Sequence, residues 1–163
     1  MTNSVNPLDY ALRVIESVAF CLHAILGITE PFTGCLRSTF RDRGAMPSWF
    51  WPVAGVVLLL VASANFSTND NVVLAAQAYI AAFHTGAVMY HRCLGDHPAA
   101  GLAPGVFILL AFIVTAIRTN VLIACLGTLV CTAIAAVLCK ILVTPPDNIE
   151  DRDRANSHSH LLT

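Results

Sequence analysis

The amino-acid sequence predicts an all-α integral membrane protein, in which a bundle of helices crosses a lipid bilayer. Hydrophobic residues make up 56% of the chain and charged residues 12%, about half the charged share of an average soluble domain. The charges gather at a few places and leave long apolar stretches between them, which is typical of membrane-spanning helices. Helices are expected because each one satisfies its own backbone hydrogen bonds inside lipid.

The apolar stretches predict five transmembrane helices between two tails. The helices are expected at about residues 10–29, 49–65, 71–90, 99–117 and 121–143, with an N-terminal tail at 1–9 and a disordered C-terminal tail at 144–163. Pro31 should end the first helix, because proline cannot continue the helical hydrogen bonding. The basic connection from Pro31 to Ser48 fits either a short helix in the membrane interface or an irregular loop. The polar break from Arg118 to Asn120 should fold the last two helices into a hairpin.

The basic residues predict how the bundle lies in the membrane. With five crossings, two arginines fall on one side, and six arginines and one lysine fall on the other. Loops rich in these residues stay cytosolic, so the N-terminus is expected to be lumenal or external and the C-terminus cytosolic. The net charge of −1 gives no electrostatic basis for binding nucleic acid, and membrane lipid is the expected surrounding.

Sequence motifs do not assign a catalytic chemistry. The six cysteines include no CxxC pair, and no Cys/His spacing matches a zinc site. There is also no GxSxG, no HExxH and no phosphate-binding loop. Motifs alone therefore leave open whether the protein is an enzyme.

Two of the expected helices carry polar residues at intervals of seven, which places each series on one helix face. The first helix carries Glu16, His23 and Glu30, and the third carries Gln77, His84 and His91. Both helices run in the same direction, and the two series begin at the same depth. If these helices are neighbours, the first members of the two series should meet, then the second members, then the third. Glu16, His23, Gln77, His84 and His91 are called the polar seam below.

The polar seam has three interpretations. It can be structural, held by interhelical hydrogen bonds worth about 0.6–2 kcal/mol each. It can be a ligand pocket or a proton path, because ionisable groups inside a membrane are often functional. It can also be a metal or haem site formed by His23 and His84, because imidazoles from facing helices are common bundle ligands. Arg13, three residues before Glu16, is expected to pair with that carboxylate.

A second face of the third helix carries small residues. Ala78, Ala82 and Gly86 recur at intervals of four, and such a series lets neighbouring helices approach closely. We expect this face to pack against another helix of the chain, another membrane protein or a second copy of the chain.

The chain resembles the DoxX-like superfamily of small membrane proteins over about Ala11 to Arg118. The resemblance lies in the order of features: a second helix with a proline at its start and a glycine, a third helix ending in His-x-x-x-Gly-Asp, and a fourth ending in arginine. These features are Pro52, Gly55, His91, Gly95, Asp96 and Arg118. The resemblance implies a four-helix core, to which the fifth helix is an addition.

Two functions are compatible with the sequence. The resemblance implies no single activity, since the superfamily includes quinone-linked thiosulfate oxidoreductase subunits and a chaperone of nicotinic receptors. The favoured hypothesis is an accessory or assembly factor that binds another membrane protein. The alternative is a membrane-embedded redox or biosynthetic enzyme, or its subunit, that binds a quinone, haem or lipophilic substrate at the polar seam.

Overall fold

The protein is helical throughout the part of the chain that the computed structural model describes, residues 6–34, 49–93 and 95–142. The elements are α1 (Pro7–Thr33), α3 (Phe50–Ala64), α4 (Asp70–Cys93), the 3-10 helix η2 (Pro98–Gly101), α5 (Leu102–Arg118) and α6 (Val121–Leu142). No strand occurs in these ranges, so the all-α prediction is confirmed there. The expected interfacial segment and C-terminal tail fall mainly on residues 35–48 and 143–163, outside the described residues.

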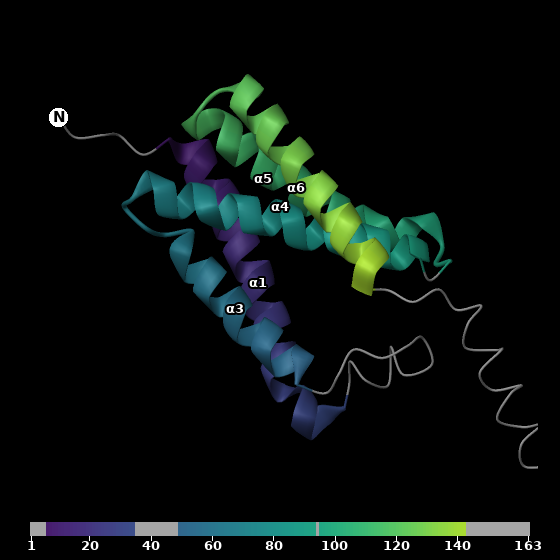
Figure 1. Cartoon of the computed structure of the whole chain (residues 1–163). Coiled ribbons are helices and arrows are strands. Elements are labelled where there is room, and N and C mark those ends of the chain that lie inside the picture. Colours follow the sequence, from purple (N-terminus) through teal and green to yellow (C-terminus); the bar gives the residue numbers. More distant parts are fainter. Residues whose placement is uncertain (1–5, 35–48, 94, 143–163) are drawn as a thin grey trace, which may run out of the picture.

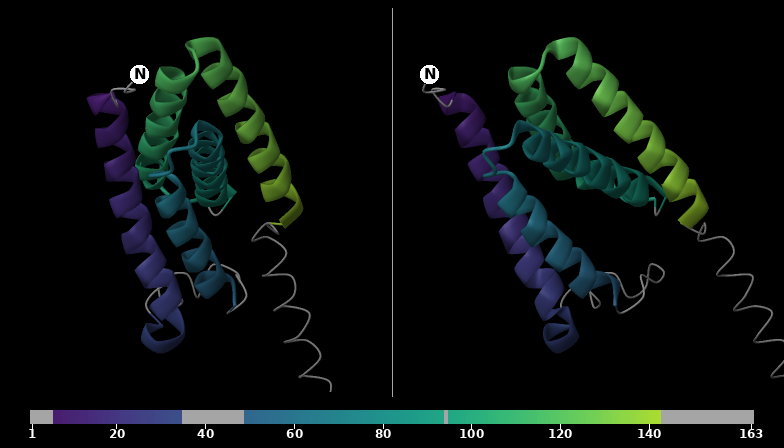
Figure 2. Two further views of the ribbon diagram at one scale, coloured as in Figure 1. Left: turned by 90° about the vertical axis from the view of Figure 1, so that its left-hand side faces the viewer. Right: turned by 60° about the vertical axis from the view of Figure 1, so that its left-hand side comes forward.

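The helices form two groups that meet at one end of the molecule (Figure 1). One group is the antiparallel pair of α1 and α3, and the other consists of α4, α5 and α6. The groups join near the start of α1, where α3 turns into α4 and α5 turns into α6, and they spread apart toward the other end (Figure 2). Parts of α1, α3, α4 and α5 therefore lie close together at this junction.

Within the described ranges, four helical stretches are long and apolar enough to cross a membrane: Pro7–Thr33, Asp70–Arg92, Pro98–Arg118 and Val121–Leu138. Many large apolar side chains on them are exposed, including Leu22, Leu109 and Leu129, as expected for helices surrounded by lipid. These features mark the chain as an integral membrane protein. The apolar helix Phe50–Ala64 has 15 residues, about 22 Å of helix against a hydrocarbon core of about 30 Å. A fifth crossing, and the orientation of the termini, stay predictions.

The first helix is longer at both ends than the sequence predicts. Asn6 caps its start, where the side-chain Oδ1 accepts a hydrogen bond of 3.0 Å from the Leu8 amide, and Pro7 occupies the first turn. The prediction that Pro31 ends the helix is wrong, because α1 continues to Thr33. Pro31 lies close enough to the end that it interrupts few bonds. Gly34, with φ 60°, then closes the helix by donating to the Glu30 carbonyl.

The α1–α3 pair is held together by a close backbone approach. A Cβ atom added at Gly55 would lie 2.7 Å from the Ala24 carbonyl oxygen, and one added at Gly27 would lie 2.7 Å from the Trp51 carbonyl oxygen. Glycine is required on both sides of this contact, because any side chain would force the helices apart. The contact fixes the position of the last turn of α3 relative to α1.

Candidate functional site

Seven polar side chains, six of them buried and one partly buried, form a cluster at the junction of the two helix groups. We call it the polar network: Asp9, Arg13, Glu16 and Ser17 of α1, Asn65 at the end of α3, Gln77 of α4 and Arg118 of α5. Glu16 and Asn65 are 0% exposed, and Gln77 is 1% exposed. Burial of this many polar groups costs free energy unless they form hydrogen bonds with one another. The hydrogen bonds that they form therefore determine which of their atoms are left to bind anything else.

The outer part of the polar network is a set of ion pairs centred on Asp9. Arg13 Nε donates to Asp9 Oδ2 at 2.9 Å, and Arg118 donates to both Asp9 oxygens at 2.8 Å. Arg118 also pairs with Asp70, whose side chain is 81% exposed, and Arg13 donates to the Asn65 carbonyl. Two guanidinium groups thus face two carboxylates, and the ion pairs join α1 to the ends of α4 and α5.

The predicted pairing of Arg13 with Glu16 is wrong. Arg13 pairs instead with Asp9, four residues earlier on the same helix. Residues four apart lie on the same helix face, as residues three apart do. Asp9 also accepts a hydrogen bond from Arg118, so its carboxylate lies beside two cations. The Glu16 carboxyl group receives no hydrogen bond from either arginine among the described contacts.

The inner part of the polar network is a set of amide hydrogen bonds around Glu16. Glu16 Oε2 accepts from Gln77 Nε2 at 2.8 Å and from Asn65 Nδ2 at 3.1 Å. Gln77 Nε2 also donates to Asn65 Oδ1 at 2.8 Å. Ser17 accepts from Asn65 Nδ2 and donates to the Ala62 carbonyl. The first pair of the polar seam, Glu16 with Gln77, therefore meets across α1 and α4.

The next polar side chain along α4, His84, lies in an aromatic cage. Its ring stacks on Phe107 with centroids 4.7 Å apart, and Phe20 and Phe83 contact it edge-on at 5.4 Å. Its Nδ1 is 2.9 Å from the Ile80 carbonyl oxygen. Because a carbonyl oxygen only accepts, this nitrogen carries the hydrogen. The cage holds the ring between α1, α4 and α5.

The other two predicted pairs of the polar seam are not among the described hydrogen bonds or ring contacts. His23 is exposed, and its Nδ1 bonds to a carbonyl of its own helix at 2.8 Å. His84 contacts Phe20 of α1 instead. His91 is 2.7 Å from Asp96 Oδ2, in the turn that follows α4. The sequence therefore placed the first pair correctly and did not find the partners of the second and third.

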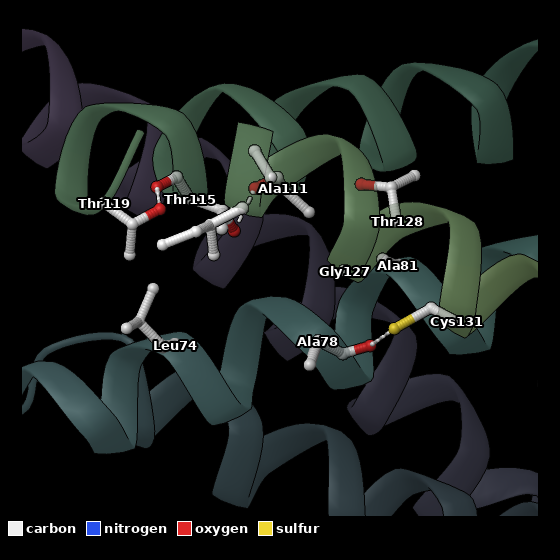
Figure 3. A pocket seen from close by; sticks show the side chains of 11 residues that line it. Leu74, Ala78, Ala81, Ala111, Thr115, Thr119, Gly127, Thr128 and Cys131 are labelled. Atoms are coloured by element: carbon white, nitrogen blue, oxygen red, sulfur yellow. Dashed lines mark hydrogen bonds between the residues drawn. The ribbon is translucent and has the colours of Figure 1, made fainter. Parts of the chain in front are cut away.

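The predicted small-residue face of α4 touches α6 at Ala78, a residue that is itself exposed. Cys131 of α6 lies with its Sγ atom 3.5 Å from the Ala78 carbonyl oxygen. Ala78 also lines a pocket of about 140 Å³ between α4, α5 and α6 (Figure 3). Gly86 has open space at its Cβ position, and Ala82 is half-buried. Ala78 thus contributes to packing between α4 and α6.

A wider groove lies on the other side of α4, between α3 and α4. Its volume is about 420 Å³, and its walls are mainly apolar. The lining residues are Val57, Leu60, Val61, Ala64, Asn71, Val72, Ala75, Ala76 and Tyr79. We call this the α3–α4 groove. Its walls include small alanines on both helices, so a second helix could approach them closely.

The described residues do not bring a cluster of metal-binding side chains together. They contain no group of three or more His, Cys, Asp or Glu side chains able to hold a metal ion. Neither the pocket nor the groove is lined by Glu16, His23, Gln77 or His84. Three aromatic rings contact the imidazole of His84, from Phe20, Phe83 and Phe107.

Five members of these interactions were missed by sequence reasoning: Ser17, Asp9, Asn65, Asp70 and Arg118. The last four lie at or near the ends of expected helices, where a polar residue is ordinary. The sequence did contain one indication of this cluster, which comes from the order in which the helices cross the membrane. In a five-span bundle these four ends lie on the same side of the membrane, so two acidic groups and one arginine fall at one level. That signal becomes specific only when the neighbouring helices are known.

No family model, curated protein or solved structure matches the chain. The resemblance to the DoxX-like superfamily therefore stays a prediction.

Proposed function

We propose that the protein is a non-enzymatic accessory or assembly factor that binds another membrane protein. The observation that carries this proposal is the separation of the polar groups from the accessible spaces. Glu16, Asn65 and Gln77 bond to one another across the helices, while the groove and the pocket are lined mainly by apolar side chains. Every side-chain amide hydrogen of Asn65 and Gln77 thus bonds within the cluster, across α1, α3 and α4.

The α3–α4 groove is the surface we assign to the partner. It is formed by residues of α3 and α4, and these two helices diverge from the turn that joins them (Figure 1). Small residues such as Ala64 and Ala75 alternate there with Val57 and Tyr79. Close van der Waals packing against small residues is the main source of helix association in membranes. A transmembrane helix of the partner is the occupant that these walls suit.

The enzyme hypothesis is less well supported by this geometry. A catalytic acid or base must lie within hydrogen-bonding reach of its substrate. Glu16 is fully buried, and His84 is surrounded by Phe20, Phe83 and Phe107. A lipophilic substrate in the groove would instead contact apolar side chains.

Substitution of Ala75 by tryptophan should release the partner. Ala75 is exposed on α4 and lines the groove, so the indole would fill the space without disturbing the core. We expect the membrane protein recovered with the wild type from its native membrane to fall on the order of tenfold, which corresponds to a loss of about 1.4 kcal/mol. Quantitative mass spectrometry of the purified complex measures this change.

The matched control is Ala133→Trp, which adds the same side chain at an exposed position on α6. This variant should recover the partner at the wild-type level. Equal recovery with Ala75→Trp and Ala133→Trp would remove the groove as the binding surface. Equal expression and elution volume of the two variants ensure that a loss of binding does not reflect misfolding.

A further inference from the structure

We propose that Glu16 and Gln77 form a binding site for a single proton, which is held on Glu16 Oε1 and shared with Gln77 Oε1. This inference is independent of the proposed function. It starts from two buried atoms: Glu16 Oε1 and Gln77 Oε1 accept no hydrogen bond from the described part of the chain. Both belong to side chains that are at most 1% exposed. Buried polar atoms in folded proteins nearly always have a partner, so a donor is missing here.

The polar groups around these two atoms have no hydrogen-bond donor left to offer them. Gln77 Nε2 donates to Glu16 Oε2 and to Asn65 Oδ1, and Asn65 Nδ2 donates to Glu16 Oε2 and Ser17 Oγ. The Ser17 hydroxyl donates to a backbone carbonyl. All the amide and hydroxyl donors of this cluster are therefore used. A hydrogen on Glu16 Oε1 would supply the missing donor, and the side-chain carbonyl oxygen of Gln77 is the other buried acceptor without a partner.

A protonated Glu16 also fits the amide hydrogen bond already present. The neutral acid offers one O–H donor and keeps a carbonyl acceptor. Gln77 offers the complementary pair, and its Nε2 lies 2.8 Å from Glu16 Oε2. The acid and the amide can then join through two antiparallel hydrogen bonds. One proton would satisfy both unpaired atoms and would bridge α1 to α4.

The surrounding charges support the neutral form of Glu16. On its own helix, Arg13 and Asp9 are near enough to act on it electrostatically, but their bonds pair them with each other. From α5, Arg118 pairs with Asp9 and Asp70. The two arginines are thus matched by two aspartates without Glu16. An ionised Glu16 would be a buried charge held only by neutral amides, which is costly in a low-dielectric interior.

Infrared spectroscopy of the protein in lipid nanodiscs tests this assignment directly, because a carboxylic acid has a C=O stretching band that a carboxylate lacks. The chain has three glutamates, Glu16, Glu30 and Glu150, so isotope labelling of the glutamate carboxyl carbons separates their bands from those of aspartate. At neutral pH we expect a labelled acid band from Glu16 in the wild type. The band should disappear in Glu16→Gln and persist in Glu30→Gln, which changes another buried glutamate of the same helix.

Two outcomes would overturn the proposal. The first is a wild-type spectrum with no glutamate acid band at neutral pH, which would mean that Glu16 is ionised and that another donor satisfies its oxygen. The second is an acid band whose intensity in Glu16→Gln is the same as in the wild type. Gln77→Met provides a second test if Glu16→Gln does not fold. It removes the acceptor proposed for the shared proton and leaves Asn65 as the amide donor to Glu16, so the acid band should move to higher frequency, and an unchanged frequency would exclude the shared proton.

Discussion

Replacement of Asp9 by asparagine is expected to destabilise the protein by about 3–5 kcal/mol, the range found when one member of a buried ion pair is removed. Asp9 is 2% exposed and accepts from both Arg13 and Arg118. Asparagine has nearly the same shape, so the effect comes from charge and not from a cavity. Arg13 would keep the Asn65 carbonyl as an acceptor but would lose its ion pair.

The matched control for Asp9→Asn is Asp70→Asn, which makes the same chemical change at a carboxylate that also pairs with Arg118. The Asp70 side chain is 81% exposed, and exposed ion pairs contribute about 0–1 kcal/mol. Free energies of unfolding in mixed micelles, measured by titration with a denaturing detergent, give the comparison. Equal losses for the two variants, or a loss below 1 kcal/mol for Asp9→Asn, would show that the ion pairs do not hold the junction.

The sequence predicted the helices well because hydropathy and helix length are local properties. The membrane-spanning stretches follow directly from the separation of charged from apolar residues. The end of α1 was the main error, because one proline near a helix end removes too little hydrogen bonding to stop it. Gly34, which closes the helix at φ 60°, was the better signal.

The polar seam was predicted in part, for a geometric reason. Polar residues spaced by seven on two helices can meet at each depth in the membrane only if the two helices run side by side. In the structure α1 packs along α3, and α4 crosses α1 at a marked angle (Figures 1 and 2). Glu16 and Gln77 lie at the crossing and meet. Below it the helices diverge, so His91 bonds to its own turn. A single sequence does not contain the crossing angle.

The close contact between α1 and α3 was not predicted, because the only small-residue series interpreted in the sequence lies on α4. Ser17 and Ala24 on α1 are seven residues apart, and so are Gly55 and Ala62 on α3. All four are buried. Two antiparallel helices with small residues at this interval can approach closely. This pattern was visible in the sequence, but nothing in it excluded α4 as the partner of α1.

Substitution of Gly55 by alanine is expected to destabilise the protein by about 1–3 kcal/mol, the usual cost of overpacking. The added Cβ would lie 2.7 Å from the Ala24 carbonyl oxygen and 3.0 Å from the Ile28 amide nitrogen. Both are backbone atoms, so no side-chain rotation relieves the clash. The helices must separate, and this movement would also stretch the bond from Ser17 to the Ala62 carbonyl.

Gly105→Ala on α5 is the control for this substitution, since no atom lies within 4 Å of its Cβ position. Alanine is favoured over glycine in a helix by about 0.5–1 kcal/mol, so Gly105→Ala should stabilise the protein slightly. The opposite signs of the two effects separate backbone contact from helix propensity, because propensity alone would make both substitutions stabilising. A gain in stability for Gly55→Ala would therefore mean that α1 and α3 lie farther apart than described. In that case the Asn65 side chain at the end of α3 would also lose its position beside Glu16.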